Sequence, residues 1–84
     1  MTEMETRIAV IAIIVEDSNS AVEINSLLHE YSTHIIGRMG IPYPAKKVSL
    51  ISVAIDAPAD VINALTGKLG RVDGVTVKTA YSKM

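Results

Sequence analysis

The sequence contains no cysteine, phenylalanine or tryptophan. Without thiols, the chain alone cannot form a disulfide scaffold, a zinc–thiolate site, an iron–sulfur ligand set or a cysteine nucleophile. Aromatic residues make up only 4% of the chain. This scarcity argues against an RNA-recognition sheet, because such sheets stack bases on exposed rings.

The chain also lacks an excess of either positive or negative charge. The formal net charge is −1, and neither the basic nor the acidic residues gather into a block. A domain that binds nucleic acid usually has such a block, because it must neutralise a line of phosphates. We therefore expect no direct contact with nucleic acid.

Long hydrophobic runs are absent as well. The longest, Ile8 to Val15, is too short to cross a bilayer and lacks the basic front and cleavage site of a signal peptide. We expect a cytoplasmic protein with no membrane partner. Because 84 residues support a single core, we expect a flexible N-terminal tail over 1–6 and one domain over 7–84.

The spacing of the apolar residues that are present predicts four strands and two helices. The strands are expected at 7–15, 33–41, 48–55 and 75–81, and the helices at 20–31 and 58–69. Ser20 and Glu23 form a capping-box pattern at the start of the first helix. Gly37 and Gly40 predict a bulged edge strand, which Pro42 to Pro44 would end in a turn.

The order strand, helix, strand, strand, helix, strand predicts an α+β ferredoxin-like sandwich. Two right-handed crossovers then place both helices on one face of a four-stranded antiparallel sheet, with the first and third strands in its centre. Both central strands are apolar at successive positions, as if covered on two sides. Since the helices cover one side only, we expect a second copy of the chain to cover the other, in a homodimer or homotetramer.

Several stretches resemble the family of iron-only hydrogenase system regulators. They are residues 7–10, 14–17, 34–43 and 65–71 with Gly74 and Val75, and the most specific of them is Gly-Arg-Met-Gly-Ile-Pro-Tyr over 37–43. The resemblance implies an ACT-like domain, similar to the C-terminal regulatory domain of nickel-responsive transcription regulators but without their DNA-binding ribbon. The metal site of those regulators uses a cysteine with several histidines, and this chain has only His29 and His34.

Three residues are candidate ligand contacts. Arg38 lies between two glycines, so a ligand carboxylate or phosphate could approach its guanidinium closely; alternatively, Arg38 pairs with an acid across a subunit interface. Tyr43 is held on a proline-flanked loop, where it could line a pocket or simply belong to a hairpin connection. Lys68 is the third candidate. Its positive charge also interacts favourably with the dipole at the C-terminal end of the second helix.

Neither a metal nor any other cofactor is expected. His29 and His34 could approach each other with Glu30 as the nearest third ligand, but two histidines alone make a poor metal site. No nucleophile with a base and no pair of acids occurs in a catalytic pattern, so we expect a protein that is not an enzyme.

The sequence therefore favours a homo-oligomeric regulatory module that senses a small molecule at a subunit interface and acts through a partner protein. One alternative is a structural subunit that pairs its edge strand or open sheet face with a larger protein and binds no ligand. A metal-responsive regulator is the other alternative.

Overall fold

The computed structural model describes residues 5–83, so most of the tail expected over 1–6 lies outside the described residues. Four strands and two helices follow the predicted order, together with three single turns of 3-10 helix. The elements are β1 (Arg7–Val15), η1 (Ser18–Ser20), α1 (Ala21–Glu30), η2 (Ser32–His34), β2 (Ile35–Tyr43), η3 (Pro44–Lys46), β3 (Val48–Ala57), α2 (Ala59–Gly70) and β4 (Val75–Tyr81).

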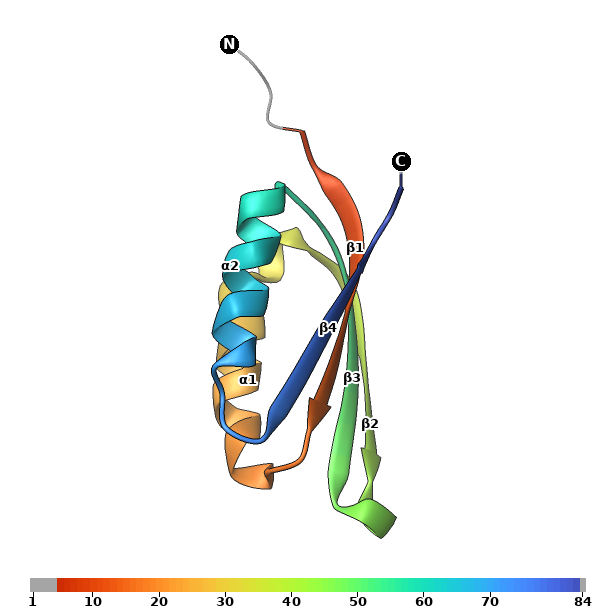
Figure 1. Ribbon diagram of the computed structural model, residues 1–84, viewed down its shortest axis with the longest axis vertical. Helices are drawn as coiled ribbons and strands as arrows, with labels where there is room; N and C mark the ends of the chain where they lie inside the picture. Colours follow the sequence, from red (N-terminus) through yellow and green to blue (C-terminus); the bar gives the residue numbers. More distant parts are fainter. Residues whose placement is uncertain (1–4, 84) are drawn as a thin grey trace.

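The strands form one antiparallel sheet in the order β2-β3-β1-β4. Figure 1 shows both helices on the same face of this sheet, while the other face carries no helix. The predicted ferredoxin-like sandwich is therefore confirmed, with β1 and β3 in the centre. β2 and β4 are the two edge strands.

The core lies between the helices and one face of the sheet. Along β1 every second residue is buried, because successive side chains of a strand point to opposite faces. The helices present apolar residues at spacings of three and four, which brings one stripe of each onto the sheet. The fully buried large side chains are Ile11, Ile13, Ile24, Leu28, Val53, Ile55, Ile62, Leu65 and Leu69.

The capping box predicted at the start of α1 is wrong. The Ser20 hydroxyl donates to the main-chain carbonyl of Asp73 at 2.6 Å instead of capping its own helix. Asp17 provides the cap, since its carboxylate accepts from the main-chain N–H of Asn19 at 2.9 Å and starts η1, which leads directly into α1. The Ser20 bond thereby ties the beginning of α1 to the loop between α2 and β4.

The prediction of a bulged edge strand is confirmed at β2. Its register with β3 shifts between Ile35 and Gly37, so one residue of β2 has no partner. The turn predicted over Pro42 to Pro44 begins only at Pro44, because β2 continues to Tyr43. An edge strand tolerates proline since its outer side needs no N–H donor, and the chain turns at η3, where Lys47 adopts a left-handed conformation.

We expect Gly74→Ala to lower the free energy of unfolding by about 1–3 kcal/mol. Gly74 has a φ of 70°, and a Cβ added there would lie 2.7 Å from Cβ of Asp17, at the point where β1 leaves the sheet. Urea denaturation at a fixed protein concentration measures the change.

The matched control for this prediction is Gly70→Ala. Gly70 ends α2, and an added Cβ would meet no atom within 4 Å. This variant should match the wild type or exceed its stability by up to about 1 kcal/mol, because alanine restricts the unfolded chain. Equal stability of the two variants would contradict the role assigned to Gly74.

Candidate functional site

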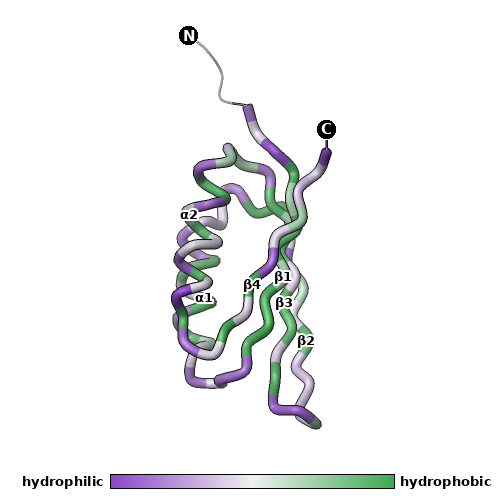
Figure 2. Tube along the Cα trace, in the orientation of Figure 1, coloured by the Kyte–Doolittle hydropathy of each residue, from purple (hydrophilic) through white to green (hydrophobic). Residues whose placement is uncertain are grey.

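The sheet face turned away from the helices is covered with apolar side chains. We call it the open face; Figure 2 shows hydrophobic residues along both central strands, although the helices lie on one side only. Seven large apolar residues of this face keep 40–60% of their surface exposed. They are Ile8, Val10 and Ile14 of β1, Met39, Ile41 and Tyr43 of β2, and Leu50 of β3.

The open face has a ridge with hollows beside it. Ile41, Leu50 and Ile14 lie side by side on β2, β3 and β1, and their large side chains make the ridge. The next two rows of the sheet combine the large side chains of Met39, Val10 and Lys78 with smaller ones. Those smaller residues are Ser52, Ala12, Ala54 and Ala80, together with Gly37.

The small residues leave two shallow hollows, of about 210 and 290 Å³. The charged residues that the strand register places on this face are Asp56, near one end of β3, and Lys78 on the edge strand β4. The centre of the open face is thus both apolar and uneven, as protein interfaces are.

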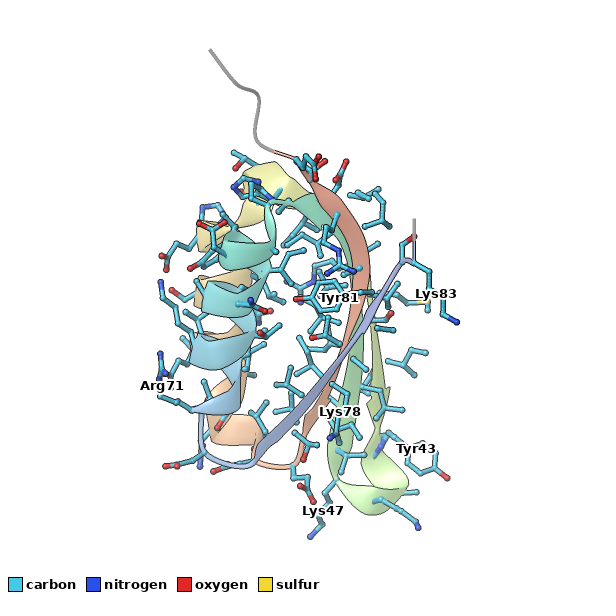
Figure 3. The ribbon with its side chains drawn as sticks, turned by 45° about the horizontal axis from the view of Figure 1, so that its top comes forward. Tyr43, Lys47, Arg71, Lys78, Tyr81 and Lys83 are labelled. Atoms are coloured by element: carbon cyan, nitrogen blue, oxygen red, sulfur yellow. The ribbon has the colours of Figure 1, made fainter. Side chains whose placement is uncertain are left out.

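Of the three predicted ligand contacts, Arg38 and Tyr43 line adjoining hollows beside the β2–β3 hairpin, whereas Lys68 lies apart from both. Arg38 lies on the helix side of β2, where its Nη2 donates to Oδ1 of Asn25 on α1 at 2.9 Å. Tyr43 is five residues further along the same strand and therefore lies on the other side. In Figure 3 its ring projects from the hairpin end away from the helices.

Lys68 lies in the helical layer and lines neither of the hollows beside Arg38 and Tyr43. Its ammonium is 3.1 Å from the Glu30 carboxylate and 5.1 Å from the centre of the Tyr31 ring. The pKa of Lys68 is raised above its ordinary value. The largest effect comes from a polar contact with Tyr31 and the next largest from the contact with Glu30. Lys68 thus links the C-terminal turns of α1 and α2.

A second surface, which we call the hairpin groove, lies on the helix side, between the start of α1 and the end of the β2–β3 hairpin. It consists of two adjoining hollows of about 200 and 540 Å³ that share Val15, Ala21, Pro42 and Ser49. Arg38 and Asn25 line the smaller hollow. The charged residues of the larger hollow are Glu16, Asp17 and Lys47.

Sequence reasoning missed Asn25 and Ser49, which come from elements distant from Arg38 in the chain. A signal for the groove was present, however. Arg38, Gly40 and Pro42 alternate along β2, so they share one side of the strand, and none of them supplies a large apolar side chain that would fill the space under α1.

His29 lies in the last turn of α1 and His34 in η2. Within residues 5–83, no three histidine, aspartate or glutamate side chains gather closely enough to hold a metal ion. Over the same residues, neither helix has the length and hydrophobicity needed to cross a membrane.

Comparisons with known proteins agree with the observed architecture. The solved structure of the uncharacterized protein TM1266 from Thermotoga maritima superimposes with a TM-score of 0.90 at 35% identity, over 94% of this chain and 100% of that one. A formyltetrahydrofolate deformylase from Pseudomonas putida KT2440 shares the fold alone, with a TM-score of 0.63 at 11% identity over 87% of this chain and 28% of that one. No curated protein matches the sequence significantly.

The family comparison covers almost the whole domain. Residues 7–79 match the TM1266-like family model, described as "Iron-only hydrogenase system regulator, putative". The matched segment begins with β1 and ends within β4, so it contains both surfaces described above. The chain therefore belongs to the TM1266-like family of iron-only hydrogenase system regulators.

Proposed function

We propose that the chain is a homo-oligomeric regulatory module of the cytoplasm whose subunits associate through the open face of the sheet. The observation that supports this proposal is the set of seven large apolar side chains left 40–60% exposed on that face. At roughly 25 cal/mol per Å² of apolar surface, covering them would contribute several kcal/mol, which is comparable to the stability of a small domain.

A second copy fits the open face better than an unrelated partner does. The face carries both a ridge, made by Ile41, Leu50 and Ile14, and hollows beside it, whose linings combine alanine, serine and glycine with larger residues such as Met39. In a two-fold dimer, the ridge of each subunit can enter the hollows of the other, because the same surface serves both partners. Asp56 and Lys78 then lie toward the rim, where charges remain in contact with water.

The regulatory role follows from the position of β2 between the two surfaces. Its residues alternate, so Met39 and Ile41 belong to the open face while Arg38 and Gly40 belong to the hairpin groove. A small molecule in the groove that moves β2 changes the surface through which subunits associate. Its effect would be a population shift between interface geometries, as in an ACT-like sensor.

A partner protein completes the proposed role. The net charge of −1 gives the module no electrostatic surface of its own for DNA, and the family description places it in a regulatory system. We propose that a DNA-binding or enzymatic partner binds the oligomer and responds to its state, and that the module itself catalyses no reaction.

We expect Leu50→Lys to dissociate the oligomer. Leu50 lies in the centre of the ridge, so its replacement would bury an unpaired ammonium in the interface and raise the dissociation constant by at least about a hundredfold. Sedimentation velocity at low micromolar concentration should give a dimer or larger species for the wild type and a monomer for the variant. Circular dichroism checks that the variant is folded.

Val22→Lys is the matched control. Val22 is an equally apolar residue on α1 with 80% of its surface exposed, outside the open face. This variant should sediment as the wild type does. A wild-type chain that remains monomeric, or equal dissociation by the two substitutions, would refute assembly through the open face.

A further inference from the structure

The smaller hollow of the hairpin groove combines one positive charge with apolar walls. It measures about 200 Å³, and Arg38 is the only ionisable residue among those that line it. Most of the remaining lining is apolar and comes from β1, α1, β2 and β3. These residues are Val15, Ala21, Pro42 and Ile51; Ile41 also borders the hollow, although the strand register turns its side chain to the open face.

The polar groups of this hollow are mainly hydrogen-bond donors. Arg38 has five N–H donors and no acceptor, and one nitrogen, Nη2, donates to Oδ1 of Asn25. Because the guanidinium can only donate, Asn25 must turn its oxygen toward Arg38, which leaves its amide N–H groups for another acceptor. The hydroxyl of Ser49 lines the same hollow.

The hollow remains open because of the residues on the helix side of β2. Gly40 lies on that side, opposite Ile51 in the sheet register. A Cβ built on Gly40 would meet no atom within 4 Å. The space over Gly40, in the hollow that Arg38 also lines, is therefore free, and a ligand could enter it without displacing any part of the chain.

We propose that this hollow binds the carboxylate of a small aliphatic monocarboxylic acid, with Arg38 as its anchor and the apolar walls around its hydrocarbon body. The planar guanidinium matches the two oxygens of a carboxylate. The neighbouring larger hollow contains two acids, Glu16 and Asp17, against the single cation Lys47, and this excess of negative charge disfavours dicarboxylates and phosphate. This proposal names the class of ligand for the regulatory role proposed above. The binding of the acid does not rest on that role; only its regulatory consequence does.

The first test titrates the isotope-labelled full chain with isovalerate and follows its amide NMR signals. We expect saturable shifts centred on Gly40 and Ser49, with a dissociation constant on the order of 1 mM for so small a probe. Isovaleramide has the same hydrocarbon body without the charge, and it should bind at least about tenfold more weakly. Inorganic phosphate should also bind more weakly than isovalerate.

Two variants locate the site. Arg38→Gln removes the charge and should weaken isovalerate binding at least about tenfold. Gly40→Val fills open space in the hollow that Arg38 lines, so the chain should fold normally and lose binding. The control Lys46→Gln removes a positive charge from η3 that lines neither hollow and should bind as the wild type does.

Three results would overturn the carboxylate site. They are the absence of saturable isovalerate binding, equal affinity for isovalerate and either isovaleramide or phosphate, and undiminished binding by Gly40→Val. Because binding is observed directly on the chain, none of these results depends on its oligomeric state.

A separate measurement tests whether this site regulates assembly. If isovalerate shifts the association of subunits, the oligomeric wild type and the monomeric Leu50→Lys variant must bind it with different affinities, because coupling between two sites is reciprocal. We expect a difference of about fivefold or more. Equal affinities would refute the regulatory coupling in the proposed function, whereas the carboxylate site itself would stand.

Discussion

The two helices of this fold cover one face of the four-stranded sheet. The central strands of the sheet, however, are apolar on both faces. On β1 the buried residues Ile11 and Ile13 alternate with Val10 and Ile14, which point away from the helices. A soluble monomer gains nothing from apolar side chains at such outward positions. The same alternation that builds the core therefore creates a second apolar surface, which the proposed association of subunits would cover.

The edge strand β2 connects this surface to the hairpin groove. Because neighbouring residues of a strand point to opposite faces, Met39 and Ile41 face outward while Arg38 and Gly40 face the groove. β2 also contains a bulge and pairs with β3 on one side only. Such a strand can shift more easily than the doubly paired β1 or β3, which is why the proposed regulation assigns the movement to β2.

The sequence was sufficient to predict the element order, the central strands and the bulge, because each depends on local periodicity or on glycine. It was insufficient where distant segments compete for the same group. Ser20 has the sequence of a helix cap, but the carbonyl of Asp73 lies close enough to accept its hydroxyl. The grouping of Lys68 with Arg38 and Tyr43 could not be checked from periodicity, and Lys68 lies in the helical layer, where it lines neither hollow of the hairpin groove. Asn25 could be identified only once α1 was placed beside β2.

If subunits associate through the open face as proposed, the separation of that face from the proposed carboxylate site has an energetic consequence. A charged ligand at the subunit interface would itself have to be desolvated whenever the subunits associate, and a buried charge without full pairing is costly. Here the ligand would contact Arg38 and Asn25 on the helix side and remain partly hydrated, while the interface stays apolar. The ligand could then act on association only by displacing β2, so its effect depends on how far the strand moves and not on bridging the two subunits.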